Sequence, residues 1–456
     1  MDTPQVVTDS HQLTKLRQWL VQNNKTAAKF KGIMKCGTGV IKQKGNRSLV
    51  YVISNNQNSA RFHGTTTCRN PWFCPVCAPK VMAARSTDIA CAIDALKTWY
   101  HQSACMITLT IPHTKDMSCK DTFNILQTAW RKFTRENNAN YLSKYKLKST
   151  GEVKYYKKDR GAYANFKCDL QIVHHIKTWE FTYGDNGFHP HMHILYWVPD
   201  KLFNKIKDYE EKLLDKWWYE IKKETLRYYA AKGKDIAEIE KHFDDKHKYP
   251  KDGHRSLYIS KDKQGNIHKV TSSHYIAGWQ SDIEMARGME YKKAGHGIEG
   301  HYAMHQILQK AIDEPNKADF WFHLYLDYMC TVQGRRRMEF SKRGGIHQII
   351  EQWKRSNTYI QRLKKKIQEN RISNQKHVVI WFTEQQWLQI CFHDLYNNAD
   401  LKTRILALAS YYGKLARDFI ITMLLEYDID TSENSMDIDE VKCLEERFKL
   451  KYQFAA

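Results

Sequence analysis

Residues 188–198 read FHPHMHILYWV, a stretch in which histidines alternate with apolar side chains before a continuous apolar run. Alternate residues of a β-strand share one face, so His189, His191 and His193 should project together. The apolar residues between them should point the other way, into a core. The sequence therefore predicts a largely buried strand with a histidine face.

A hairpin turn precedes this strand. Residues 184–187 read GDNG, which favours a two-residue turn between a strand at 172–183 and the histidine strand. If the two central residues form the turn, Glu180 lies opposite His191. If the turn is centred one residue later, Glu180 lies opposite His193. Both registers place the carboxylate on the histidine face, whereas a slip of one residue would move it to the other face.

Two imidazoles and a carboxylate on one face can bind a single divalent cation. His191 and His193, with Glu180 across the hairpin, form a set that mixes nitrogen and oxygen ligands. Mn²⁺ and Mg²⁺ are both compatible with it, and His189 is a candidate extra ligand. The alternative is a histidine-rich strand that only satisfies its neighbours. We favour the metal, because three histidines share the face with a carboxylate.

A second set of potential metal ligands lies upstream. Cys68, Cys74 and Cys77 fall within ten residues, and Cys36 precedes them. The Cys-x-x-Cys spacing lets two thiolates bind one tetrahedral ion, so the four cysteines predict a structural Zn²⁺ site, with His63 as an alternative fourth ligand. Unrelated reduced cysteines and a redox dithiol are less favoured readings, the latter because no βαβ pattern surrounds the motif.

The overall charge indicates the class of partner. The 456 residues carry 72 Lys+Arg and 50 Asp+Glu, which gives a net charge of +22 and points to a polyanion such as nucleic acid. Hydrophobic residues make up 42%, which excludes a wholly disordered chain. No apolar run is long enough to span a membrane, and the N-terminus has no export signal. We therefore expect a cytoplasmic protein that binds no membrane.

The remaining pattern predicts an α+β fold with a central antiparallel sheet flanked by helices. Residues 105–111 add an apolar, β-branched strand that ends at a proline. The expected domains are an N-terminal region with the zinc module at 1–100, a central domain at 101–343 and a helical C-terminal region at 344–456. Residues 139–168, rich in Lys and Tyr, should form an exposed basic insertion.

At these motifs the sequence resembles the HUH endonucleases, in particular the plasmid rolling-circle replication initiators (Rep proteins). The resemblance spans most of residues 36–343. Its segments are Cys36-Gly37, the cysteine motif at 67–77, Thr108-Leu109-Thr110, residues 180–184, the histidine strand at 189–193, residues 275–279, residues 334–337 and Ser341-Lys342.

The resemblance implies both a fold and an activity. Such proteins have a central antiparallel sheet related to the RNA-recognition fold. They nick one strand at a plasmid's double-strand origin through a tyrosine that stays joined to the 5′-phosphate, and the freed 3′-OH primes a host polymerase. The implied partners are origin DNA, single- and double-stranded, with a host helicase and DNA polymerase in the bacterial cytoplasm. The sequence has no P-loop motif, which fits unwinding of the DNA by a host helicase.

The resemblance places the nucleophile at Tyr275. The family often carries a Lys three residues further on, which is Gly278 here. Related initiators carry a Glu four residues before the tyrosine, which is Thr271 here, so the residue that activates water for termination is left open. Tyr258 is the alternative nucleophile. It has Lys261 at the family spacing but lies in an apparent strand.

Two kinds of side chain are candidates for DNA contacts. Basic groups bind phosphates and aromatic rings stack on single-stranded bases. The basic candidates are Arg335, Arg336 and Arg337, and the aromatic candidates are Trp72, Trp179, Trp197 and Trp279. Two other functions stay open: a zinc-stabilised DNA-binding regulator without catalysis, and an HUH transposase or relaxase.

Overall fold

The computed structural model describes much of the chain. The described residues are 19–20, 31–42, 48–55, 59–135, 142–146, 153–157, 161–246, 256–262, 264–271, 302–342, 344–362, 376–397, 399–412, 415–431 and 434. Tyr275 and Trp279 lie outside them.

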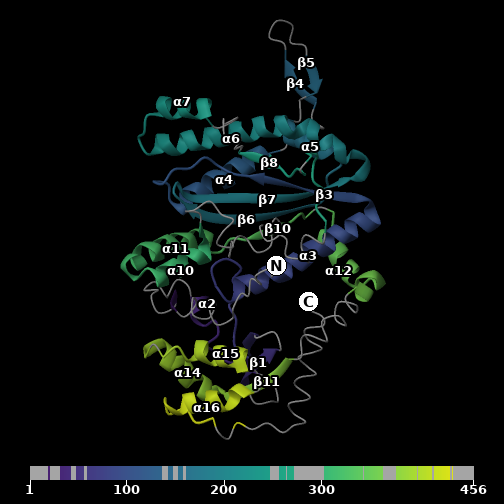
Figure 1. Cartoon of the computed structure of the whole chain (residues 1–456). Coiled ribbons are helices and arrows are strands. Elements are labelled where there is room, and N and C mark those ends of the chain that lie inside the picture. The colour runs from purple at the N-terminus through teal and green to yellow at the C-terminus, as the bar shows by residue number, and fades with distance from the viewer. Residues whose placement is uncertain are drawn as a thin grey trace. The chain divides into compact units, whose positions relative to one another are not determined.

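The larger sheet has six strands, all paired antiparallel. They are β3 (Gln102–Leu109), β6 (His175–Gly184), β7 (Gly187–Pro199), β8 (Leu257–Ile259), β9 (Tyr302–Ala303) and β10 (Met338–Phe340). The order is β10-β6-β7-β3-β8, and β9 also pairs with β6. The predicted α+β fold, with antiparallel sheets and helices, is therefore confirmed (Figure 1).

One face of this sheet is packed against helices. These are α4 (Cys119–Phe133), α5 (Ala162–Asp169) and α6 (Glu210–Ala231). The ring of Phe123 on α4 lies 4.8 Å from that of Trp179, and Phe166 on α5 lies 5.5 Å from Tyr196. Burial of each such ring contributes about 2–3 kcal/mol. Met192, fully buried on the same face, confirms that the apolar residues of the histidine strand point into a core.

The local sequence explains why α4 starts where it does. The Ser118 hydroxyl accepts a hydrogen bond from the backbone N–H of Asp121, which caps the helix. Asp121 in the first turn also suits the helix dipole. The buried positions then recur at helical spacing along one face of the helix.

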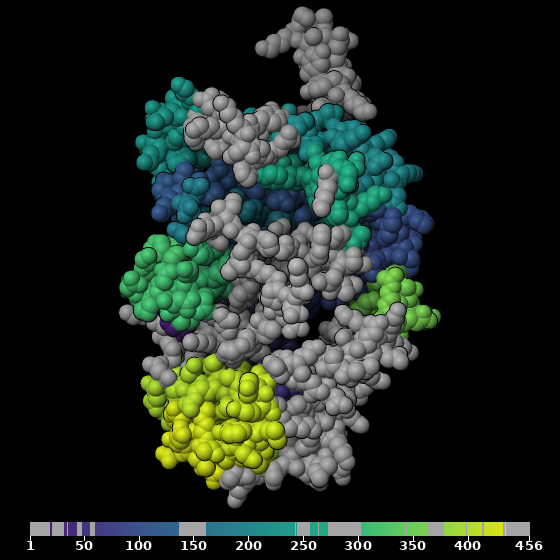
Figure 2. Space-filling model, in the orientation of Figure 1, coloured from purple at the N-terminus to yellow at the C-terminus, as the bar shows by residue number. Residues whose placement is uncertain are grey.

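The second sheet pairs two strands from the N-terminal part of the chain with one from the C-terminal part. Its strands are β1 (Leu49–Asn55), β2 (Ser59–His63) and β11 (Lys376–Thr383), in the order β11-β1-β2. It packs on α14 (Glu384–Tyr396), α15 (Leu401–Tyr412) and α16 (Ala416–Leu425), through a core that includes Val50, Phe382 and Trp387. In Figure 2 these C-terminal helices form the surface at the yellow end of the colour scale.

The C-terminal region at 344–456 is therefore not purely helical, which corrects our expectation. Residues 376–383 read KHVVIWFT, whose β-branched and aromatic side chains suit a strand, and β1 supplies an antiparallel partner. The chain divides into two compact units, each made of segments that are far apart in the sequence. One compact unit combines residues 1–85, 307–322 and 355–456, and the other combines 86–306 and 323–354.

The structure describes further helices and strands in the two units. They are α2 (Lys31–Met34), α3 (Cys77–Tyr100), β4 (Leu142–Lys146), β5 (Val153–Lys157), η2 (Asp200–Tyr209), α7 (Ile236–Lys246), α10 (Met304–Asp313), η3 (Pro315–Lys317), α11 (Ala318–Val332) and α12 (Ile346–Lys354). Among the described residues, no helix combines the length and the apolar character that crossing a membrane requires.

Candidate metal sites

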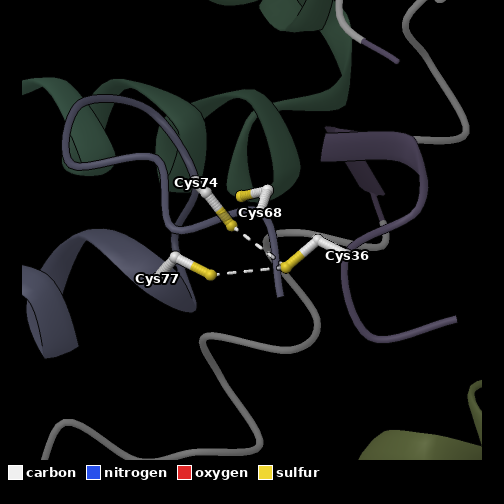
Figure 3. A group of neighbouring side chains, drawn as sticks. All are labelled: Cys36, Cys68, Cys74 and Cys77. Atoms are coloured by element: carbon white, nitrogen blue, oxygen red, sulfur yellow. Dashed lines mark hydrogen bonds between the residues drawn. The ribbon is translucent and has the colours of Figure 1, made fainter. Parts of the chain in front are cut away.

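Four cysteine sulfurs converge on one point in the unit that contains the chain ends. Their ligand atoms all lie within 4.8 Å of one another. The Sγ of Cys36 lies 3.4 Å from that of Cys77 and 3.7 Å from that of Cys74 (Figure 3). Four sulfurs around a Zn²⁺ at 2.3 Å would be about 3.8 Å apart. Cys36, Cys68, Cys74 and Cys77 thus form a group that could hold a metal ion such as zinc.

Tight local backbone structure holds these cysteines. The side-chain carbonyl of Asn70 accepts hydrogen bonds from the N–H groups of Trp72 and Phe73, which folds the chain back between Cys68 and Cys74. Cys77 is the first residue of α3. The thiol pair of this motif is therefore set by a short turn that leads into a helix.

Cys36 approaches from a separate segment. Gly37 follows it with φ 72°, in the left-handed region that glycine adopts without strain, and its N–H donates to the Thr66 carbonyl at 2.7 Å. This bond ties the Cys36 loop to the chain just before Cys68. His63 lies on β2 with its ring 6.4 Å from that of Tyr51, and it is not part of the sulfur group.

Mutual hydrogen bonding shifts the pKa values of the four thiols in different directions. Hydrogen bonds from Cys68, Cys74 and Cys77 lower the pKa of Cys36 far below its ordinary value. Hydrogen bonding with Cys36 raises the pKa of Cys74, which is fully buried. A cation at the centre would replace these protons and satisfy all four sulfurs.

The histidine face takes the first of the two predicted registers. Gly184 pairs with Gly187, so Asp185 and Asn186 form the turn, and Glu180 lies opposite His191. Gly187 has φ 88°, and a Cβ there would lie 3.1 Å from the backbone of the segment after β3. A glycine is required at this position both for conformation and for space.

His193 is the best fixed residue of this face. Its Nε2 lies 2.8 Å from Glu180 Oε2, and its Nδ1 lies 2.9 Å from the hydroxyl of Thr108 on β3. The side chains of His193 and Glu180 are each only 4% exposed. Thr178 pairs with His193 from the other side, on β6, and its buried hydroxyl has no hydrogen-bond partner among the described residues.

The donor set is chemically suited to a divalent cation. Adjacent ligands of an octahedral ion at 2.0–2.1 Å are about 3 Å apart, close to the 2.8 Å between His193 Nε2 and Glu180 Oε2. Thr108 on Nδ1 fixes the ring as outer partners of metal-bound histidines do. In the described part of the chain, however, only the cysteines bring three or more ligand atoms within 4.8 Å of one another.

The end of β3 explains why His191 is more exposed than His193. The β3–β7 ladder stops at the pair Leu109–Met192, so His191 has no partner in that ladder. Pro190, which lacks an N–H, also lies beyond the end of this ladder, where β3 takes no hydrogen bond from it. The histidine face is therefore buried at His193 and half-buried at His191 and His189, which form its more open end.

An additional histidine joins the open end. The ring of His113 stacks on His189 at 4.4 Å, and His189 lies 4.0 Å from His191. His191 lies 6.1 Å from His193, so four rings follow one another along the face. Sequence reasoning missed His113. The signal was available, because residues 111–113 continue directly from the predicted strand at 105–111.

Of the two candidate nucleophiles, Tyr258 lies within the described residues and Tyr275 does not. Tyr258 pairs with Thr108, and Thr108 pairs with His193 on its other side. Tyr258 therefore shares the histidine face, two strands away from His193. Tyr275 lies outside the described residues, and its position relative to the histidines stays a prediction.

Several proposed DNA contacts are buried. Trp72, Trp179 and Trp197 are 3%, 2% and 0% exposed, so these rings are core residues and cannot stack on bases without unfolding. Arg337 is 6% exposed. Arg335 lies over the Phe123 ring at 4.5 Å and donates to the Gln127 side chain. Of the three arginines, only Arg336 is exposed.

No protein-family model matches this chain, and neither does any curated protein or solved structure.

Proposed function

We propose that this chain is a metal-dependent endonuclease that nicks and rejoins one DNA strand, and that it initiates rolling-circle replication of a plasmid. The observation that carries the proposal is the 2.8 Å contact between His193 and Glu180, with His191 opposite Glu180 on the same face. A catalytic site of this kind needs imidazole and carboxylate donors that converge and remain open on one side.

The residues divide the work as follows. His191, His193 and Glu180 would hold Mn²⁺ or Mg²⁺, which when bound neutralises charge on the scissile phosphate. Thr108 orients the His193 ring through its hydroxyl. His189 and His113 extend the imidazole row toward the open end, where they would meet the DNA backbone.

A tyrosine would supply the nucleophile. Its oxygen attacks phosphorus, the bond to the 3′-oxygen breaks, and the 5′-phosphate becomes a phosphotyrosine ester. The tyrosine loses its proton and the departing 3′-oxygen gains one, so the step is balanced. The free 3′-OH is then a primer for a host polymerase, with a host helicase to open the duplex. We place this role at Tyr275 by resemblance, with Tyr258 as the alternative.

The other features fit the same function. A net charge of +22 would attract origin DNA in its single- and double-stranded forms. The four cysteines would bind Zn²⁺ as a structural ion, because all four ligand positions would be taken by sulfur and none left for a substrate.

The test uses the purified full chain with a supercoiled plasmid that carries its own replicon. With Mn²⁺ we expect relaxed or nicked plasmid and DNA covalently joined to protein. Mass spectrometry of the adduct should find the phosphodiester link on Tyr275, or on Tyr258 if the alternative holds. Zinc-loaded, folded protein that yields neither nicked plasmid nor adduct would contradict the proposal.

Matched variants separate the metal from the fold. His193→Ala should abolish adduct formation, whereas Met192→Leu, next to it on the core face, should leave adduct formation intact. Tyr275→Phe and Tyr258→Phe then identify the nucleophile, since only one of them should remove the adduct.

One observation favours a second candidate, a zinc-stabilised DNA-binding regulator. Among the described residues the cysteines alone meet the metal-binding spacing, so the histidine face need not bind a metal. On this candidate, His193→Ala and both tyrosine variants would leave DNA binding and plasmid maintenance unchanged, while Cys74→Ser would abolish both.

A further inference from the structure

Strands β4 (Leu142–Lys146) and β5 (Val153–Lys157) pair with each other as a two-stranded antiparallel ribbon (Figure 1). Within the described part of the chain no third strand pairs with it. The ribbon lies in the basic segment that connects α4 to α5. No step of the proposed function uses it.

The register distributes positive charge along the whole ribbon. Its five pairs are Leu142–Lys157, Ser143–Tyr156, Lys144–Tyr155, Tyr145–Lys154 and Lys146–Val153. Four of the five pairs contain a lysine, three contain a tyrosine, and neither strand contains an acidic residue. Because alternate pairs lie on opposite faces, both faces of the ribbon carry lysine and tyrosine positions.

Such a ribbon is poorly stabilised by itself. An isolated two-stranded hairpin is at best marginally stable in water, and the two strands hold four lysines and no acidic residue in their sequence. A polyanion would supply the opposite charge. A two-stranded ribbon also fits the DNA major groove, which is about 12 Å wide. Five strand residues span about 17 Å, which is about five base pairs.

Helix α5, which follows the ribbon in the chain, packs on one identifiable face of the six-stranded sheet. Tyr163 of α5 lies with its hydroxyl 3.1 Å from that of Tyr196, and Phe166 packs on the same ring. Tyr196 lies on the sheet face opposite His193, because three residues along a strand reverse the side. The helices that precede and follow the ribbon in the chain, α4 and α5, therefore both pack on the sheet face opposite the histidines.

We propose that the β4–β5 ribbon is a DNA-gripping arm that contacts the duplex beside the nick site through Lys144, Lys146, Lys154 and Lys157. The inference rests on the proposed function for its substrate, origin duplex. It is separate from the chemistry, because the arm binds phosphates of the uncut duplex and takes no part in the cleavage.

The test compares two sets of four substitutions in the full chain. In the arm variant, Lys144, Lys146, Lys154 and Lys157 are changed to Gln. In the control variant, four exposed lysines of the same compact unit are changed to Gln: Lys201, Lys205, Lys234 and Lys241. The measurement is the affinity for a duplex oligonucleotide between 50 and 200 mM salt.

The arm variant should lower the slope of log K against log salt by about 2–4, since each phosphate contact contributes about 0.9. Replacing the same four lysines by Arg should keep the slope. A double variant with Lys144→Gln and Lys154→Gln should lower the slope by half as much. It replaces the four-lysine variant if that protein loses zinc or has a lowered melting temperature. The control variant should change the slope by less than 1.

An unchanged slope of log K against log salt in the arm variant would overturn the arm, and so would an equal change in the control variant. The arm would also be overturned if the arm variant lost affinity for phosphatidylserine vesicles but kept its affinity for DNA. Nicking of a single-stranded origin oligonucleotide should persist in the arm variant. If no variant and no wild-type protein nicks, the proposed function fails, while a lowered duplex slope still supports the arm.

Discussion

The cysteine group and the histidine face are built in different ways. Three of the four cysteines lie within ten residues, and a short turn into a helix brings their sulfurs together. The histidine face is assembled from strands, because His193 depends on Glu180 from β6 and Thr108 from β3. A local turn can bring ligand atoms to the separation that one metal ion requires. On a sheet face, the separation of the ligand atoms is set by the distance between neighbouring strands.

This difference also separates the expected roles. Sulfurs that enclose an ion on all sides leave no position for a substrate, so such a site stabilises the fold. The histidine face has a buried end at His193 and a more exposed end at His191 and His189, so a substrate could reach an ion there. The following predictions test the contrast, from the largest expected effect to the smallest.

Loss of a sulfur should damage the fold. Cys74→Ser should release the bound zinc and lower the free energy of unfolding by on the order of 5 kcal/mol or more, because binding energy of a structural zinc is folding energy. Metal analysis and thermal melting of the purified chain measure both. Cys168→Ser, at an exposed cysteine outside the group, should change neither. Full zinc occupancy in Cys74→Ser would show that the four sulfurs do not act together.

Loss of the carboxylate should damage activity and spare the fold. Glu180→Gln keeps the shape but removes the charge that a divalent cation needs, so the nicking rate should fall about 10²–10⁴-fold. Zinc content and melting temperature should stay close to wild type. Met192→Leu is the control on the core face. A wild-type nicking rate in Glu180→Gln would remove the carboxylate from the site.

Loss of the Thr108 hydroxyl should lower the affinity for the cation without abolishing its binding. Thr108→Val takes away the partner of His193 Nδ1, so the Mn²⁺ concentration for half-maximal nicking should rise about 10–100-fold. Thr178→Val is the matched control from the other neighbouring strand, because the Thr178 hydroxyl has no partner among the described residues. Equal effects of the two substitutions would mean that the hydroxyl does not orient the ring.

Acid should destabilise the unit that carries the histidine face. Burial, with a smaller contribution from Arg337, lowers the pKa of His305 to about 3. The unfolded chain therefore takes up this proton first. Stability is complete above about pH 6.5 and declines as the pH falls toward 3, by about 2 kcal/mol at pH 5. His305→Leu should reduce the difference in unfolding free energy between pH 8 and pH 5, measured with urea. An unchanged difference would contradict the assignment.

Much of both sites follows from local sequence. The turn at 184–187 sets the register, so the hairpin motif by itself places Glu180 on the histidine face. The Cys-x-x-Cys motif likewise defines its own geometry. These are short-range features, in which the residues that matter are close together in the chain.

Long-range contacts were not predictable in the same way. The strand at 376–383 pairs with β1 more than 300 residues earlier, and no local pattern specifies that partner. The burial of Trp179 and Arg337 depends on which helices cover the sheet, as does the contact of Arg335 with Phe123. A tryptophan or arginine has the same local sequence signal in a core as at a DNA surface.

The most direct test of the central claim is a Mn²⁺ titration of the zinc-loaded protein followed by electron paramagnetic resonance. We predict one bound Mn²⁺ per chain in wild type, with zinc undisturbed, and none at the same concentration in His193→Ala. One Mn²⁺ bound equally by wild type and His193→Ala, or none bound by wild type, would contradict a cation on the histidine face.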